Sequence, residues 1–265
     1  MPDMETIYRR LIHAPWGMIL VAGPTGSGKS STLYASLNQL DKVENKIITI
    51  EDPAEYRFEG ISQVQVNRQA NITFASGLRA AMRLDPDIIL VGEIRDQETA
   101  RTAVQASLTG HLVFSTIHAN DSVGAIVRLV DLGVEPFLVT SSLLGVLSQR
   151  LLRRVCRQCR TPREADPIEQ LVFERELGEK RAVFDYGVGC NNCAETGYRG
   201  RVAMFELLTM NDEIRRLVLR NANTDEIAAA AVQGGMRSML KDGLLKAQSG
   251  ITTPTEVLKN VFSLQ

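Results

Sequence analysis

The stretch that decides the fold is Gly23-Pro24-Thr25-Gly26-Ser27-Gly28-Lys29-Ser30, which matches the pattern G-x-x-x-x-G-K-[ST]. It follows the apolar run Met18–Ala22, which predicts a strand, and it opens a helical pattern from Lys29 to Leu40. Glycines in such a turn let backbone N–H groups curl around a phosphate, and the following helix adds the positive end of its dipole. The sequence therefore predicts a nucleotide-binding loop.

Two side chains of this loop have separate predicted roles. Lys29 is expected to reach the β- and γ-phosphates of ATP, and the Ser30 hydroxyl to coordinate Mg²⁺. The alternative is a glycine-rich turn with a chance Lys-Ser pair, which the strand and helix on either side disfavour. The predicted cofactor-binding residues are Gly23, Pro24, Thr25, Gly26, Ser27, Gly28, Lys29, Ser30 and Ser31.

Around this loop, as far as Arg150, short β-branched runs alternate with helical segments, which is the pattern of parallel strands joined by helical crossovers. Strands are predicted at Met18–Ala22, Lys46–Glu51, Gln63–Asn67, Asp87–Gly92 and Leu112–Thr116. Helices are predicted at Lys29–Leu40, Phe74–Arg83, Gln97–Leu108 and Ser122–Asp131, with one more over residues 133–148. These elements predict an α/β fold with a mainly parallel sheet.

After Arg150 the pattern changes, because residues 150–200 hold all four cysteines and show little periodicity. Helices are predicted again at Asp212–Leu219, Thr224–Gln233, Met236–Gln248 and Thr255–Phe262, with Thr224 and Thr253 as N-caps. We therefore predict three parts: an α/β core over residues 1–148, a cysteine module over 149–204 and a helical C-terminal subdomain over 205–265.

The composition narrows the class of protein. Of 265 residues, 44% are hydrophobic, and 30 Lys+Arg against 31 Asp+Glu give a net charge of -1, so no whole-chain basic field attracts nucleic acid. The apolar runs are shorter than the roughly 20 residues that span a bilayer. The N-terminus lacks the basic-then-apolar layout of a signal peptide. We expect a cytoplasmic protein that binds no nucleic acid.

A carboxylate, Glu93, follows the predicted strand Asp87–Gly92. The Asp that usually ends such a strand on the Mg²⁺ side is missing, and Gly92 stands in its place. Ligands of a parallel sheet sit outside the carboxyl ends of its strands, and Asp87 would lie about 20 Å below Glu93. We therefore predict Glu93, and not Asp87, at the site, as the general base that orients and polarises the attacking water.

A second acidic set, residues 51–55, ends a predicted strand on the same side of the sheet. Asp52 or Glu55 could take the water or Mg²⁺ role that Gly92 cannot fill. Acids at strand ends are often solvated turn residues, and the complete phosphate loop makes the functional interpretation the stronger one.

Two histidines bracket the predicted strand that begins at Leu112. His118 would emerge at the carboxyl end of this strand, where it could contact a γ-phosphate or its neighbours. His111 lies at the start of the strand and would reach the site only if the chain bends. His13, in an amphipathic stretch, is expected to be structural.

The cysteines form two pairs, Cys156-x-x-Cys159 and Cys190-x-x-Cys193, which together are typical of a four-cysteine zinc site. The 30 residues between the pairs exceed the usual spacing. Closing the longer loop costs only about 0.5 kcal/mol more, whereas structural zinc contributes on the order of 10 kcal/mol. We predict a structural zinc ion, with free buried thiols as the alternative.

Arginines crowd the first cysteine pair, with no acid among them. They could offset the charge of four thiolates around zinc, or present a basic patch to an acidic protein, lipid or nucleic-acid partner. The residues concerned are Arg150, Arg153, Arg154, Arg157, Arg160 and Arg163.

Taken together, these segments resemble one family, the secretion ATPases that power type II secretion and type IV pilus assembly. The resemblance covers nearly the whole chain in order, at residues 23–34, 50–55, 85–100, 109–120, 149–151 and 197–201 and the two cysteine pairs. In that family the first four blocks are called Walker A, Asp box, Walker B and His box. The cysteines resemble the assembly branch, because the pilus-retraction branch lacks them.

The resemblance implies a RecA-like P-loop core that acts as a ring hexamer in the cytoplasm, at the bacterial inner membrane. ATP hydrolysis would drive rotation of an inner-membrane platform protein, with a cytoplasmic recruiting subunit as a further partner and no direct membrane contact. The implied catalytic residues are Glu93 as base, Glu55 as its assistant with Mg²⁺ or water, and His118 of the His box. The implied cofactors are ATP, Mg²⁺ and structural Zn²⁺.

One feature departs from the family pattern. Family members carry a further domain ahead of the phosphate loop, which supplies arginines to the ATP of the neighbouring subunit, whereas 22 residues precede Gly23 here. The resemblance therefore implies a carboxyl-terminal piece of a longer chain, which binds Mg-nucleotide but hydrolyses ATP slowly and assembles poorly.

A DNA- or RNA-dependent P-loop motor is the alternative function. The near-neutral charge and a content of 5% aromatic residues, which leaves few stacking platforms, weigh against it. A nucleotide that only holds a scaffold in shape is disfavoured because Lys29, Ser30 and Glu93 are all present.

Overall fold

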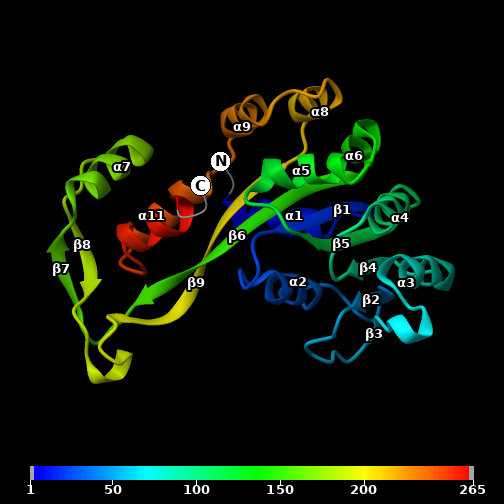
Figure 1. Ribbon diagram of the computed structural model, residues 1–265, viewed down its shortest axis with the longest axis horizontal. Coiled ribbons are helices and arrows are strands. Elements are labelled where there is room, and N and C mark those ends of the chain that lie inside the picture. Colours follow the sequence, from blue (N-terminus) through cyan, green and yellow to red (C-terminus); the bar gives the residue numbers. More distant parts are fainter. Residues whose placement is uncertain (1–2, 263–265) are drawn as a thin grey trace. The chain divides into compact units, whose positions relative to one another are not determined.

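A seven-stranded sheet runs through the computed structural model, which describes residues 3–262 (Figure 1). All the strand pairs from β3 to β6 in this sheet are parallel. The α/β fold with a mainly parallel sheet is therefore confirmed. In sheet order the strands are β3 (Ile61–Gln65), β2 (Ile47–Glu51), β4 (Ile88–Val91), β5 (Leu112–Ile117), β1 (Gly17–Ala22), β6 (Leu143–Val155) and β9 (Tyr198–Thr209).

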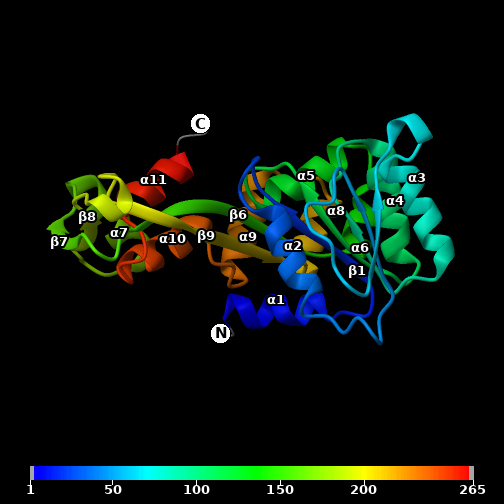
Figure 2. The same ribbon diagram turned by 90° about the horizontal axis from the view of Figure 1, so that it is seen from below.

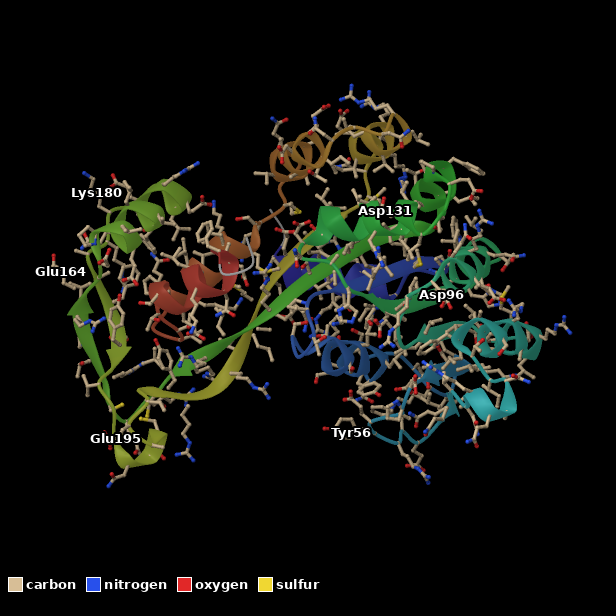
Figure 3. The ribbon with its side chains drawn as sticks, in the orientation of Figure 1. Tyr56, Asp96, Asp131, Glu164, Lys180 and Glu195 are labelled. Atoms are coloured by element: carbon tan, nitrogen blue, oxygen red, sulfur yellow. The ribbon has the colours of Figure 1, made fainter. Side chains whose placement is uncertain are left out.

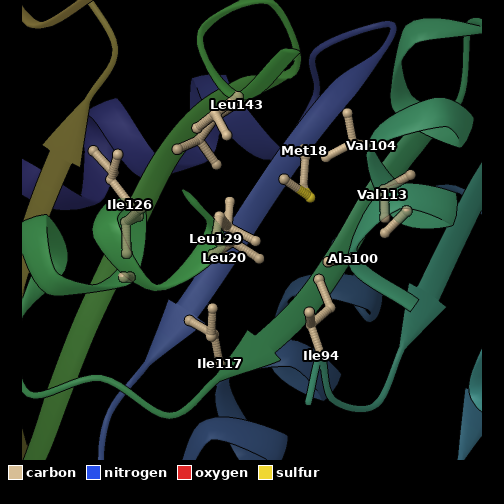
Figure 4. Close-up of a cluster of buried hydrophobic side chains, with 14 of the residues drawn as sticks. Met18, Leu20, Ile94, Ala100, Val104, Val113, Ile117, Ile126, Leu129 and Leu143 are labelled. Carbon is tan, nitrogen blue, oxygen red and sulfur yellow. The ribbon is translucent and has the colours of Figure 1, made fainter. Parts of the chain in front are cut away.

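The alternation of side chains along each strand explains why both faces of this sheet are covered by helices. In β1, Met18 and Leu20 point to one hydrophobic cluster and Ile19 and Val21 to another. The first cluster also holds side chains of α3 (Phe74–Ala81), α4 (Gln97–Leu108) and α5 (Ser122–Asp131), several of which Figure 4 shows. The second holds side chains of α1 (Met4–Ile12) and α2 (Lys29–Leu37), and Figure 2 shows α1 at the bottom of the view, below α2.

The chain divides into two compact units. The first comprises the chain up to Thr25, Lys29–Ser148 and Leu207–Met236, and it includes α6 (Pro136–Ser142), α8 (Asp212–Leu219) and α9 (Thr224–Gln233). The second comprises Gly26–Gly28, Gln149–Glu206 and the chain from Arg237 onward. The division into three parts that the sequence suggests stays a prediction.

The second unit has a small core of its own. Two strands, β7 (Arg160–Glu164) and β8 (Val183–Gly187), pair antiparallel, and α7 (Pro167–Leu177), α10 (Met239–Gln248) and α11 (Pro254–Phe262) pack with them. The rings of Phe173 and Phe184 meet edge to face, with 5.0 Å between centroids. Both are fully buried, and this aromatic pair stabilises the packing of α7 on β8.

The predicted helix over residues 133–148 is wrong in its second half. Helix α6 ends at Ser142, and Leu143 begins β6, which pairs parallel with β1. Most of its apolar residues are buried, and Val146 is fully so. Such an apolar run has no periodicity that separates a buried strand from a buried helix, so its pairing with β1 decided the outcome.

The weakly periodic region 150–200 also holds regular structure, namely parts of β6 and β9 together with β7, α7 and β8. Thr224 is the first residue of α9 rather than its N-cap, because the Asn223 side chain accepts the Glu226 N–H. Thr253 does cap α11, since its Oγ1 accepts the Glu256 N–H at 3.1 Å.

Within residues 3–262, every helix falls short of the length and apolar character required to cross a membrane.

An ion pair between the buried carboxylate of Glu256 and the half-exposed guanidinium of Arg153 connects α11 to β6 in the second unit. The Glu256 carboxylate accepts the Arg153 Nε at 3.0 Å and the Arg153 Nη2 at 2.7 Å, and it also accepts the backbone N–H of Arg153. Burial raises the pKa of Glu256, but the hydrogen bonds from Arg153 outweigh it, so the pKa lies below its ordinary value. Glu256 therefore stabilises the unit in its ionised form.

We predict that Glu256→Gln lowers the free energy of unfolding by about 1–3 kcal/mol at pH 7. A depressed folded pKa gives stability above the unfolded pKa, which is about 4.3, and this stability is lost as the pH falls through the folded pKa. The difference in free energy of unfolding between the unaltered protein and Glu256→Gln should therefore shrink below about pH 4. Urea unfolding of the two proteins at pH 7 and pH 3 measures this difference. An equal difference at both pH values contradicts the stabilising role of the ionised Glu256.

Candidate active site

The loop between β1 and α2 forms a turn that needs glycine. Gly26 and Gly28 have φ angles of 76° and 87°, in the left-handed region that side chains disfavour. A Cβ added at Gly26 would meet nothing within 4 Å, so the surface there is open to a ligand. Lys29 is the first residue of α2, so the loop runs directly into the N-terminus of a helix, which favours anions.

The Lys29 side chain folds back over this loop. Its Nζ donates to the carbonyl oxygens of Gly23 at 2.9 Å and Pro24 at 3.0 Å. Burial lowers the pKa of Lys29, and the charge of Glu93 acts in the opposite direction. Within residues 3–262, the buried Ser27 Oγ has no hydrogen-bond partner. A phosphate group fits next to Lys29, because its oxygen atoms accept hydrogen bonds from an ammonium group.

Glu93 lies just beyond β4 with a side chain that is only 13% exposed. Its Oε1 is 3.0 Å from Nε2 of His118, which follows β5, and its Oε2 accepts Nη2 of Arg95 at 2.6 Å. The bond to Glu93 raises the pKa of the Arg95 guanidinium, which burial alone would lower. The sheet therefore brings Glu93 and His118 together, and Glu93 lies near enough to Lys29 for its charge to act on the ammonium group.

These residues line an open pocket. Its walls are formed by Glu93, Ile94, Arg95, His118 and Arg128 of α5, and its volume is about 370 Å³. One carboxylate faces two guanidinium groups and an imidazole, so the pocket attracts anions.

Crowding explains the absence of an acid at Gly92. A Cβ at this position would lie 3.2 Å from the carbonyl oxygen of Ile50 and 3.3 Å from the Phe74 ring. A larger side chain would have to displace β2 or α3. The backbone of Gly92 is also fixed, because its carbonyl oxygen accepts the Thr116 hydroxyl at 2.8 Å. Any metal-side acid must therefore come from another segment.

Glu51, the last residue of β2, belongs to the acidic set of residues 51–55 but received no role of its own in the sequence analysis. Glu51 is buried, and its carboxylate accepts the Thr49 hydroxyl at 2.6 Å, the Gln63 amide at 3.1 Å and the Tyr34 hydroxyl. Glu55, the predicted assistant, has its backbone N–H 3.3 Å from the Tyr34 oxygen. The only sequence signal for Glu51 was a carboxylate at the last position of an apolar strand.

Three other residues that the sequence analysis considered, of which it proposed neither Asp87 nor His13 for the site, lie apart from this cluster. Asp87 accepts the Lys46 N–H at the opposite end of the sheet, where the strands begin. His111 precedes β5, and its Nδ1 is 2.9 Å from the carbonyl oxygen of Ala106. The ring of His13 caps α1, with Nδ1 2.7 Å from the carbonyl oxygen of Arg9.

The four cysteines form a second cluster, in the unit that also contains the labelled Glu195 of Figure 3. All four sulfur atoms lie within 4.8 Å of one another, and none is in a disulfide. Sulfur pairs Cys156–Cys190, Cys159–Cys193 and Cys190–Cys193 are 3.9, 3.8 and 3.7 Å apart. A tetrahedron with Zn–S bonds of about 2.3 Å has edges of about 3.8 Å, so the sulfur atoms fit zinc.

Several arginines near the cysteines have partners inside their own unit. The Arg153 guanidinium stacks 4.1 Å from the Tyr198 ring centroid, and that of Arg163 lies 4.0 Å from the Tyr186 ring centroid. Arg150 Nη1 donates to the carbonyl oxygen of Asn260. Part of the cluster therefore stabilises the fold of this unit.

The model of one protein family, the type II/IV secretion system proteins, matches residues 1–259. The chain belongs to this family. Type II secretion system protein E of Pectobacterium carotovorum subsp. carotovorum is 52% identical to it over 251 residues, and the type IV pilus assembly ATPase PilB of Thermus thermophilus is 49% identical over 262 residues.

These matches cover 94% and 97% of this chain but 49% and 29% of the two relatives. The chain therefore spans about half the length of the first relative and less than a third of the second. A crystal structure of the pilus retraction motor PilT with bound ADP matches 98% of this chain and 64% of that one, with a TM-score of 0.72 and 31% identity. The family that the sequence motifs indicated is thus confirmed.

Proposed function

We propose that this family member binds ATP with Mg²⁺ at the loop before α2 and hydrolyses it at Glu93. The observation that carries this is the position of Glu93, paired with His118 and near Lys29, at the carboxyl edge of the sheet. In this proposal residues 23–31 hold the nucleotide, with Lys29 on its β- and γ-phosphates and the Ser30 hydroxyl as a Mg²⁺ ligand. Bound Mg²⁺ would neutralise charge on the phosphates.

Glu93 acts as the general base in this proposal. It takes a proton from the water that attacks the γ-phosphate, and His118 binds close to that phosphate. Both carboxylate oxygens are engaged in the structure, one with Arg95 and one with His118. Each oxygen keeps a further acceptor position for the attacking water, because an ionised carboxylate offers about four lone-pair sites. Glu55 assists with Mg²⁺ or with the water, since Gly92 leaves no room for an acid.

We further propose that hydrolysis powers the assembly of pilin or pseudopilin filaments. The names of the relatives, a type II secretion protein and a pilus assembly ATPase, support this proposal over a nucleic-acid-dependent motor. In the full protein the chain would act in a ring hexamer in the cytoplasm, held at the inner membrane by a platform protein and a recruiting subunit. The test measures the ATPase activity of the full protein during titration with the platform's cytoplasmic domain or with DNA. Strong stimulation of the activity by DNA, with none from the platform domain, would favour the nucleic-acid-dependent motor instead.

Replacing the proposed base tests the hydrolysis. We expect Glu93→Gln to lower single-turnover ATP hydrolysis about 10²- to 10⁴-fold, because a carboxamide cannot take the proton. Binding of a fluorescent ATP analogue should change less than threefold. The matched control is Glu98→Gln, five residues on, where an exposed carboxylate pairs with Arg79. Equal hydrolysis by both variants would rule out Glu93 as the base.

We also propose that the four cysteines hold a structural zinc ion. Their spacing fits a closed tetrahedral shell, which leaves no open position for a substrate. Backbone N–H groups of Cys190 and Gly197 donate to the Cys193 sulfur, each at 3.3 Å, and such bonds favour a thiolate. No other apolar side chain of the described residues joins the buried cysteine cluster, so zinc would supply stability that packing does not.

Metal analysis tests this proposal. We expect about one zinc per purified chain, with thiols that react with Ellman's reagent only after chelation, and a melting temperature that falls when zinc is removed. Cys156→Ser should lose most of the zinc, whereas Arg157→Ser, at an exposed position in the same loop, should keep it. A folded protein with four reactive thiols and no zinc would exclude the site.

A further inference from the structure

Tyr34 connects the phosphate-binding helix to the acidic segment after β2. It lies in α2, four residues after Ser30 and hence about one helical turn from it. Its buried hydroxyl donates to Oε2 of Glu51 and accepts the backbone N–H of Glu55 at 3.3 Å. One oxygen atom thus contacts both Glu51, at the end of β2, and the backbone of Glu55, which the proposed function assigns to Mg²⁺ or water.

The segment that follows β2 is organised around this tyrosine. The Tyr34 ring lies 4.9 Å from the Phe58 ring and meets the Tyr56 ring edge to face at 5.9 Å. Tyr56 is labelled in Figure 3. Gln63 of β3 donates to the carbonyl oxygen of Tyr56 at 2.8 Å and accepts the Phe58 N–H at 2.9 Å. The loop is therefore held on both sides, by α2 and by β3.

The Tyr34 hydroxyl donates its hydrogen bond to Glu51. Burial and the bond to Glu51 raise the pKa of Tyr34 well above its ordinary value, so the hydroxyl keeps its proton. The hydroxyl donates this proton in a hydrogen bond to the Glu51 carboxylate, and a lone pair on its oxygen accepts the Glu55 N–H. The Glu55 contact therefore depends on the hydroxyl and not on the ring.

We propose that Tyr34 is a positioning residue for the acidic segment. Its hydroxyl fixes the backbone at Glu55 relative to the helix that begins with Lys29 and Ser30, so that the carboxylate of Glu55 and the hydroxyl of Ser30 face one metal ion together. This inference rests on the proposed Mg-ATP chemistry. It names Tyr34 as the side chain that joins the phosphate-binding helix to the acidic segment.

Two hydroxyl deletions separate positioning from stability. Tyr34→Phe and Thr49→Val each remove one hydroxyl donor from the buried Glu51 carboxylate, but only Tyr34→Phe also removes the acceptor of the Glu55 N–H. Both variants should lower the melting temperature. Amide exchange by NMR in the nucleotide-free protein should become about tenfold faster at Glu55 in Tyr34→Phe and stay unchanged in Thr49→Val.

Metal binding gives the second readout. With a non-hydrolysable ATP analogue bound, Mn²⁺ affinity measured by electron paramagnetic resonance should fall about tenfold in Tyr34→Phe and less than twofold in Thr49→Val. The kcat for ATP should also fall about tenfold in Tyr34→Phe, and binding of Mg-ATP should weaken by the same factor as metal binding, because the two affinities are linked.

Equal behaviour of the two variants in exchange and Mn²⁺ binding would overturn the inference, since Tyr34 would then act only through Glu51. That result is distinguishable from failure of the proposed function, which would show in the unaltered protein. An unaltered protein that binds Mn²⁺ with the analogue but does not hydrolyse ATP would contradict the hydrolysis alone. One that binds neither would overturn both.

Discussion

Parallel pairing of the central strands is the constraint on which the candidate active site depends. In the order β2-β4-β5-β1, all carboxyl ends lie at one edge of the sheet. Each strand brings one component there: β1 the phosphate loop, β2 the acidic segment, β4 Glu93 and β5 His118. These segments are far apart in the sequence. They meet because helices cover both faces of the sheet and leave its edge free for a ligand.

Electrostatics at this edge centre on one carboxylate. The Glu93 side chain is largely buried, and its two oxygens contact Arg95 and His118. The charge of Glu93 also raises the pKa of Lys29, against the effect of burial. The side chains of Arg95 and His118 are largely exposed, so water screens their contacts with Glu93 in part. The backbone next to Glu93 is held by a hydrogen bond from the Thr116 hydroxyl to the Gly92 carbonyl oxygen, and Gly92 packs closely against Ile50 and Phe74. Charge and packing thus fix the position of Glu93 together.

The second unit reaches stability by different means. Its apolar core is small, and it adds the Glu256–Arg153 pair, arginines stacked on tyrosines and a cluster of four sulfur atoms. A unit of this size gains much from a few strong contacts, because a small core buries little apolar surface. The arginines that the sequence left open between a basic patch and a structural role include several with partners in this unit.

The sequence by itself determined the family, the phosphate loop, the two cysteine pairs and four helices with their observed bounds: Gln97–Leu108, Ser122–Asp131, Asp212–Leu219 and Thr224–Gln233. These features are local, since a cap residue, a glycine turn or a helical period is complete within about a dozen residues. The position of Glu93 at the sheet edge was also predictable, because the direction of a parallel strand follows from its neighbours.

Only the tertiary structure decided the features that depend on distant residues. Residues 143–148 form a strand because β1 offers them a partner. Glu51 is tolerated in the interior because hydroxyls from Tyr34 and Thr49 reach it, and the loop at Glu55 takes its place through the same tyrosine. A side chain's hydrogen-bond partners across a fold are set by packing, which no local pattern of residues encodes.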